Sequence, residues 1–390
     1  MTISRKTKSS WKDYIVLLSL IVVFFSPVFA THSFLIPLHV DTDFEDHNNW
    51  AADIRNGRDV PDYVLAHAMW QITLAALNLF AGIPFNTASL ISAILYVFLT
   101  AIILICWLIP VWKERRIHRA WLYALIMGML VAAPVSLLWF EDRLMYFGYI
   151  GITSYHNPTI IVLRPLALLQ FIYAFLCFQP SGLTPRNIML VGVISALATF
   201  AKPSFAICIL PATGILSMIL LAKKQYIDIK GLILGIIVPT VFVLAVQYLA
   251  TYHESDSEGI LFLPFEVMSK YSKFLLPKFI LSILFPLAVL FFHYKDTFSD
   301  SRMRLAWLIF AFGMIYTYFF AESGYRMVHG NFGWSGEIAS FVLFMATTVF
   351  YMEKPAASFG KTVVIRGAWV AHVVFGIAYY FYSLFSGTYV

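Results

Sequence analysis

Twelve residues near the start of the chain gather several groups that could exchange protons. The stretch HVDTDFEDHNNW (39–50) contains the titratable side chains Asp41, Asp43, Glu45, Asp46 and His47. A helix over 43–55 would place Asp43, His47 and Trp50 on one face, because they stand at i, i+4 and i+7. A carboxylate one turn before a histidine suits general-base catalysis on a hydroxyl group. We therefore expect a catalytic role for Asp43, with His47 beside it.

Other interpretations of this stretch stay open. Asp43 could instead cap the start of the helix, which would leave Asp41 or Asp46 as the base. The sequence Asp-Thr-Asp at 41–43 also supplies oxygen ligands for a divalent cation, so such a cation is possible. No zinc-type spacing occurs, and the three cysteines lie inside apolar runs, which predicts buried thiols. The sequence identifies no definite cofactor and no definite metal site.

Two further segments offer groups that could bind an anion. The sequence SYHNPT places Tyr155, His156 and Asn157 before a helix start, where backbone N–H groups can receive negative charge. Asn157 could equally cap that helix. Arg164, about one turn later, and Lys202, in ATFAKPSF, are both surrounded by apolar residues. Each therefore needs an anion or a group of carbonyls within reach.

A last polar cluster lies within the sequence AESGYRMVHGNFGWSGE (321–337). Glu322, Arg326 and His329 have i, i+4, i+7 spacing, so a helix would place them on one face. Asn331 and Trp334 follow in a glycine-rich turn. The arginine fork matches phosphate, and the tryptophan face suits the CH surface of a sugar. We expect all five residues to bind substrate.

The elements that must position these residues are membrane helices. Of the 390 residues, 60% are hydrophobic and 12% are charged, and the mean hydropathy is +0.79. Repeated apolar runs of about twenty residues predict an all-α, polytopic integral membrane protein with about 11–12 transmembrane helices. The loops are short, so 1–390 is expected to form one transmembrane domain. The net charge of +6 is interpreted by membrane side and predicts no nucleic-acid partner.

Lysine and arginine predict the orientation. They collect in segments that we expect in the cytoplasm: 1–13, 113–119, 222–225, 294–304 and 353–367. This arrangement requires the apolar run 62–82 to be an interfacial or re-entrant element. It is the weakest candidate for a membrane span, because it is interrupted by Asp62, His67, Trp70, Gln71 and Asn78. The first apolar run extends to about residue 37, too long for a typical signal core, so we expect an uncleaved helix. All candidate residues then belong to the outer face, in or beside the loops 38–61, 141–159, 251–275 and 322–337.

Three stretches resemble the GT-C superfamily of membrane glycosyltransferases. They are the acidic loop that continues as WAADIRNGRDVPDYVLAHAMWQ, the segment GVISALATFAKPSFAICILP ending its first helix at Lys202, and the loop 141–159. Members take a sugar from a polyprenyl-phosphate carrier on the non-cytoplasmic face. The resemblance implies Asp43, Asp41 or Asp46 as base and Lys202 as the phosphate ligand, with assistance from His156 and Arg326. Many members also have a soluble domain, which we do not expect in these 390 residues.

The expected protein is thus a glycosyltransferase of the bacterial inner membrane, with its N-terminus in the cytoplasm. Its partners would be a polyprenyl-phosphate-linked sugar, a lipid, glycan or protein acceptor, and membrane lipids. One alternative is a polysaccharide polymerase or ligase of the outer face, which would use arginine and histidine in large loops. Another is a transporter or flippase of lipid-linked glycans, which would place charges at mid-membrane and show paired repeats.

Overall fold

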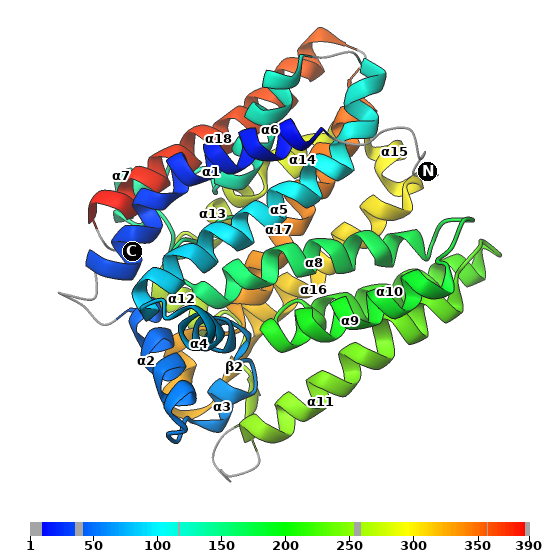
Figure 1. The fold of residues 1–390 in the computed structure, drawn as a ribbon. Coiled ribbons are helices and arrows are strands. Elements are labelled where there is room, and N and C mark those ends of the chain that lie inside the picture. Colours follow the sequence, from blue (N-terminus) through cyan, green and yellow to red (C-terminus); the bar gives the residue numbers. More distant parts are fainter. Residues whose placement is uncertain (1–9, 36–41, 116–117, 253–258, 357, 387–390) are drawn as a thin grey trace.

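Helices make up almost all of the structure, as the apolar runs predict. The computed structural model describes residues 10–35, 42–115, 118–252, 259–356 and 358–386. Within these ranges the strands form one two-stranded antiparallel sheet, β1 (Ile260–Phe262) with β2 (Phe320–Glu322). The prediction of an all-α polytopic membrane protein is confirmed (Figure 1).

Six described helices are long and apolar enough to cross a membrane. They are α1 (Trp11–Ala30) with its π-helical extension Thr31–Leu35, α5 (Phe85–Arg115), α8 (Pro158–Leu176), η3 (Gly231–Ile237) continued by α11 (Val238–Tyr252), α17 (Gly333–Glu353) and α18 (Phe359–Ser386). The pair α13 (Leu275–Ser282) and α14 (Leu284–Phe292), bent by 68°, makes a seventh if it is one span. Four shorter apolar helices are α4 (Met69–Ala81), α6 (Arg119–Val131), α9 (Pro185–Ala201) and α10 (Ala206–Ala222).

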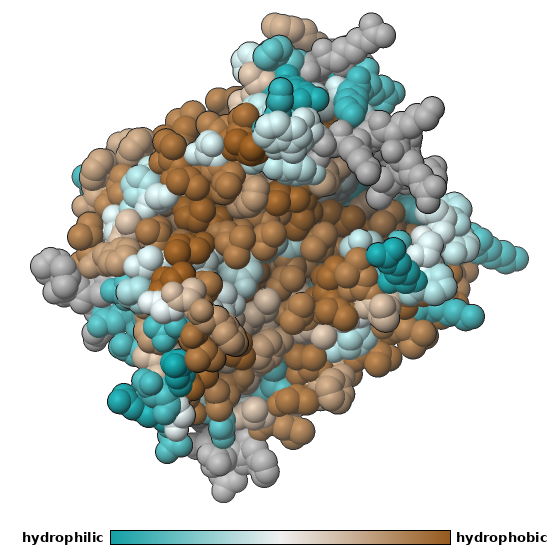
Figure 2. Space-filling view, viewed as in Figure 1, coloured by the Kyte–Doolittle hydropathy of each residue, from teal (hydrophilic) through white to brown (hydrophobic). Residues whose placement is uncertain are grey.

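The remaining elements are shorter or more polar. They are α2 (Asp43–Asn56), α3 (Asp62–Leu65), α7 (Trp139–Asp142), α12 (Glu266–Tyr271), α15 (Tyr294–Ser299), α16 (Ser301–Phe319) and the 3-10 helix η4 (Gly324–His329). Helix α17 lies at the centre of the bundle, and nearly all of its residues are buried. Figure 2 shows hydrophobic side chains over the middle of one face and hydrophilic side chains toward two opposite ends. This distribution fits a protein with its middle in lipid.

The basic segments expected in the cytoplasm meet at one end of the bundle. Arg119, at the start of α6, pairs with Asp13 in the first turn of α1 at 2.9 Å. Arg302 of α16 pairs with Glu353 at the end of α17 at 2.7 Å. Arg115, at the end of α5, donates to the Glu353 carbonyl at 3.1 Å. We call this the basic end; the side of the membrane that it faces stays a prediction.

The weak apolar run 62–82 does not extend between the two ends. It divides into α3 and α4, and α4 packs against α2 and α5 at the end opposite the basic end. Figure 1 shows α4 end-on, whereas α8, α9 and α10 are seen from the side. Asn48 of α2 donates to Asn86 in the first turn of α5 at 3.0 Å, which ties these elements together. Helices α2 to α4 therefore form a cap at one end of α1 and α5.

Two of the predicted helical runs are interrupted inside the bundle. At both interruptions, His372 of α18 forms a hydrogen bond with the backbone. Helix α6 ends at Val131, and the following extended residue Ala133 accepts from His372 Nδ1 at 2.7 Å. The break at Ile283 leaves the Phe285 N–H, which donates to His372 Nε2 at 3.3 Å. Because Nε2 accepts, the proton of the neutral ring is on Nδ1. The close approach also needs glycine at 376 in α18, where a Cβ would overlap the Val131 carbonyl.

Two smaller expectations are wrong. Cys177 and Cys208 are buried as predicted, but Cys106 on α5 is exposed. The residues 322–329 do not form one helical face, because Glu322 ends strand β2 and the following turn is the 3-10 helix η4. The pairing of Glu322 with Ile260 in the sheet fixes this corner instead.

Candidate functional site

A cavity of about 1060 Å³ lies at the end of the molecule opposite the basic end. Its walls come from α2, the corner between α3 and α4, the segment before α8, the turn between α9 and α10, α11, and the region from β2 to α17. This volume is at the upper limit of ordinary ligand pockets. Its titratable residues include Asp43, Asp46, His47, His67, His156, Lys202, Glu322, Arg326 and His329. Residues from the beginning, middle and end of the chain thus share one chamber.

Helix α2 presents the acidic part of the cavity. Thr42 caps this helix and accepts from the Glu45 N–H at 3.3 Å, so the alternative of Asp43 as the cap is wrong. Asp43, His47 and Trp50 all line the cavity, in agreement with their predicted common helical face. Asp46 also lines it and is exposed. Asp41, and with it the possible cation site at 41–43, lies outside the described residues.

Asn157 connects the acidic part of the cavity to its basic part. Its Nδ2 donates to the Asp43 carboxylate at 2.7 Å. Its Oδ1 caps α8 by accepting from the Ile160 N–H at 3.1 Å, and also accepts from Thr159 Oγ1 at 2.7 Å and from Lys202 Nζ at 3.4 Å. The expected cap is therefore present, and it fixes the orientation of the amide. One side chain holds Asp43 and Lys202 on opposite ends of its amide group.

Lys202 is the first residue after α9, where Pro203 prevents the helix from continuing. Its ammonium donates to Thr159 Oγ1 at 2.8 Å and lies 4.6 Å from the centroid of the Trp334 ring. These partners and Asn157 are all neutral, and the ion pairs among the described residues do not include Lys202. An ammonium has three donor hydrogens. The third remains for an anion in the cavity.

Burial shifts the proton equilibria of the cavity in a consistent way. It raises the pKa of Asp43, against the hydrogen bond from Asn157 and the charge of Lys202, which lower it. Burial lowers the pKa of Lys202 to about 8, although Asp43 and other carboxylates oppose this shift. Burial also lowers the pKa of His47 and His156 well below the ordinary histidine value. At neutral pH the cavity therefore places the Lys202 cation beside the neutral imidazoles of His47 and His156.

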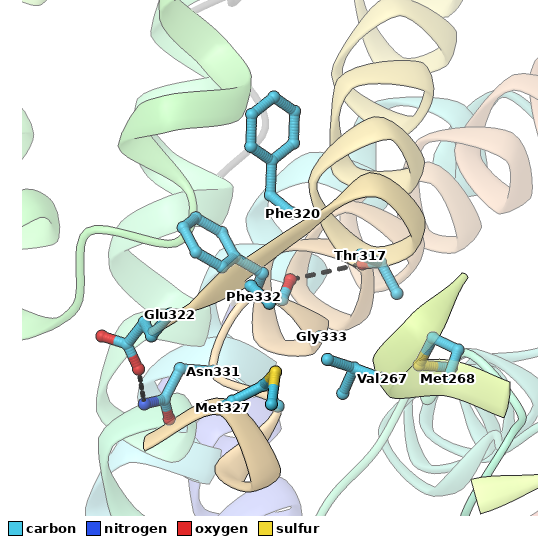
Figure 3. A pocket seen from close by; sticks show the side chains of 11 residues that line it. Val267, Met268, Thr317, Phe320, Glu322, Met327, Asn331, Phe332 and Gly333 are labelled. Carbon is cyan, nitrogen blue, oxygen red and sulfur yellow. Dashed lines mark hydrogen bonds between the residues drawn. The ribbon is translucent and has the colours of Figure 1, made fainter. Parts of the chain in front are cut away.

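A third group of residues closes the cavity beside η4. Glu322 pairs with Arg326 at 2.7 Å and also accepts from the side-chain amide of Asn331, a bond drawn in Figure 3. Arg326 also lies 5.1 Å from the centroid of the Tyr63 ring. Glu322 thus neutralises the charge of Arg326 within the cavity wall. His329, the remaining titratable residue of this group, is exposed.

Arg164 and Tyr155 do not line the cavity. Arg164 pairs with the buried Glu337 of α17 at 3.2 Å and donates to the Ser154 carbonyl at 3.3 Å. The anion and the carbonyl that a cation among apolar residues needs are therefore supplied by the protein itself. Tyr155 is buried against the rings of Phe25 and Tyr379. Both residues lie behind the site and are placed to support it.

The sequence analysis did not assign several residues that build the site. His67 lines the cavity, and Gln71 contacts His47 at 2.7 Å, but both served there only as polar interruptions of an apolar run. Gln247 of α11 lines the cavity and donates to the carbonyls of Ala66 and Thr199, each at 2.8 Å. The available signal was an isolated amide side chain in an apolar helix, which needs hydrogen-bond partners.

Comparisons with known proteins found no match. No family model matches the chain, and no curated protein or solved structure matches it. Within the described ranges, no group of three or more His, Cys, Asp or Glu side chains is arranged to hold a metal ion. The arrangement offers a partly buried carboxylate, a lysine with neutral partners, neutral imidazoles and several aromatic rings. These groups can accept a proton, bind an anion and pack against a sugar.

Proposed function

We propose that this protein is a membrane glycosyltransferase of the GT-C type. It moves a sugar from a polyprenyl-phosphate donor to a lipid, glycan or protein acceptor on the non-cytoplasmic face of the membrane. The observation that supports this proposal best is the junction at Asn157, which holds Asp43 and Lys202 in one cavity. A transferase of this kind needs a base for the acceptor and a cation for the leaving phosphate.

The proposed reaction is a single displacement at the anomeric carbon of the sugar. Asp43 takes the proton of the acceptor hydroxyl while the acceptor oxygen bonds to that carbon. The bond from the carbon to the phosphate oxygen breaks, and its electron pair leaves with the phosphate. Lys202 stabilises the charge that develops on this phosphate. The raised pKa of Asp43 improves it as a base compared with an ordinary aspartate.

The composition of the walls fits a lipid-linked sugar. Apolar or aromatic residues of α10, α11 and the β1–β2 sheet line one side of the cavity, namely Ile207, Leu244, Tyr248, Ile260 and Phe320. A prenyl chain from the membrane can pack there with its phosphate at Lys202. Trp50, Tyr63 and Trp334 line other parts of the cavity. Their rings suit the CH faces of a sugar.

The same features argue against the transporter alternative. A transporter of charged lipids needs charged or broken elements that line the path at mid-membrane. The deep charges Arg164 and Lys278 are instead paired, with Glu337 and Asp142 respectively, and neither cation lines the cavity. At the break between α13 and α14, His372 accepts a hydrogen bond from the backbone N–H of Phe285. A polymerase would use the same chemistry and would differ only in its acceptor.

The proposal is tested by the glycans and lipids of cells that lack this protein. We expect loss of one glycosylated product and accumulation of its polyprenyl-phosphate-sugar donor. Wild type should restore the product, whereas Asp43→Asn and Lys202→Ala should not, at equal amounts of membrane protein. Asp53→Asn is the matched control, because Asp53 lies on the same helix and pairs with Arg58. Unchanged products in the deletion strain would refute the proposal, and full activity of Asp43→Asn would move the role of base to Asp46 or Asp41.

A further inference from the structure

Gln71 is a fully buried amide in the mostly apolar helix α4. Its Nε2 lies 2.7 Å from Nδ1 of His47, in a contact that is itself buried. Burying an amide side chain is unfavourable unless hydrogen bonds compensate it. His47 lines the cavity on α2, so this contact joins α4 directly to the candidate site. Nothing in the proposed reaction so far uses Gln71.

The orientation of the Gln71 amide decides which nitrogen of His47 carries a proton. In the amide orientation of the structure, Nε2 of Gln71 faces Nδ1 of His47, and Oε1 has no hydrogen-bond partner among the described residues. Because Nε2 only donates, Nδ1 of the ring accepts in this orientation. A neutral imidazole that accepts at Nδ1 has its hydrogen on Nε2. We propose that Gln71 is a positioning residue, which holds His47 with its proton on Nε2 and directs a neutral N–H donor to a ligand in the cavity.

The surroundings of His47 agree with a neutral ring. Lys202, from the turn between α9 and α10, acts on it electrostatically, and Asp43 and Asp46 of its own helix line the same cavity. His67, at the corner between α3 and α4, also faces it. Lys202, His67 and burial all disfavour the imidazolium form. Trp50 holds the ring edge-on, with the two ring centroids 5.1 Å apart.

The role of this donor rests on the proposed function. In a glycosyl transfer, Asp43 accepts the proton of the acceptor, and His47 donates a hydrogen bond to an oxygen of the sugar or its phosphate. The two residues lie one helical turn apart and have different roles. Asp43 accepts a proton and His47 donates a hydrogen bond, so they do not compete as bases. Helix α4, which packs against α2, thereby contributes Gln71 to the site.

The test measures the tautomer of His47 in the intact, purified protein in lipid nanodiscs. Histidine is labelled with 15N, and His47→Gln identifies the His47 signals by their disappearance. At pH 7 we expect a protonated Nε2 and an Nδ1 with the resonance of a hydrogen-bonded acceptor. In Gln71→Met, the Nδ1 resonance should move to the position of an unbonded acceptor. A protonated Nδ1 or an imidazolium in wild type would overturn the inference, as would an unchanged Nδ1 resonance in Gln71→Met.

A second arm separates positioning from folding. Gln170→Met is the matched control, because Gln170 is also fully buried and donates to Thr240 at 3.1 Å, away from the cavity. Both variants lose one buried amide, but only Gln71→Met should lower product formation in the deletion strain, by about tenfold. Equal product formation by the two variants would overturn the inference. If no product depends on this protein, the proposed function fails, while the resonances of His47 still decide its tautomer.

Discussion

Removing only one member of the ion pair behind the cavity should strongly lower the stability of the protein. The side chains of Arg164 and Glu337 are 8% and 2% exposed, and their charged groups lie 3.2 Å apart. Arg164→Met leaves Glu337 with the Tyr146 hydroxyl, at 2.5 Å, as its remaining side-chain partner among the described residues. Removing one member of a buried pair costs about 3–5 kcal/mol, because the other charge stays buried without compensation. Arg164→Met should therefore lower the free energy of unfolding by about that amount.

The double variant decides whether the pair is the cause. In Arg164→Met with Glu337→Met, no isolated charge remains, so the loss should be clearly smaller than the sum of the two single losses. Denaturant unfolding of the purified protein in detergent measures all three. The exposed pair Arg58–Asp53 is the control, because its side chains are 71% and 30% exposed. Arg58→Met should cost less than about 1 kcal/mol. An additive double variant, or equal costs for Arg164→Met and Arg58→Met, would refute the reasoning.

Three further predictions follow from single positions. The pKa of Lys202 is lowered to about 8, so transfer should decline as the pH rises through 8, and Lys202→Arg should move this decline to higher pH. A pH–rate profile that is the same for both proteins would contradict this. Gly376→Ala should reduce the yield of folded protein, because its Cβ would overlap a backbone carbonyl, whereas Gly367→Ala has open space and should not. Cysteines at positions 115 and 58, in a cysteine-free background, should be labelled by impermeant reagents from opposite sides of the membrane, and labelling from the same side would reject the orientation.

The sequence predicts the class of fold because lipid imposes a simple rule on composition. A long apolar run must form a helix in the membrane, where backbone groups have no water to bond. The face of α2 with Asp43 and His47 is also predictable, because helical spacing is local information. The same is true of Lys202, since Pro203 marks the end of its helix. Each of these features depends on neighbours in the sequence.

The features that the sequence does not predict depend on distant residues. Arg164 finds Glu337, which is 173 positions away, so its role as an internal partner has no local signal. The breaks after α6 and α13 are tolerated because His372, on the last helix, bonds to both. The β1–β2 sheet has strands of three residues, too short to show an alternating pattern. For Gln71 a signal was present, but its partner His47 is visible only in the fold.

The most direct test of the central claim is an experimental structure of the protein with a bound polyprenyl phosphate. We predict that a phosphate oxygen lies within about 3 Å of Lys202 Nζ, with the prenyl chain along the side of α11. The bridging oxygen or the attached sugar should point toward Asp43. A phosphate bound at the basic end, or in the cavity without contact to Lys202, would contradict the account.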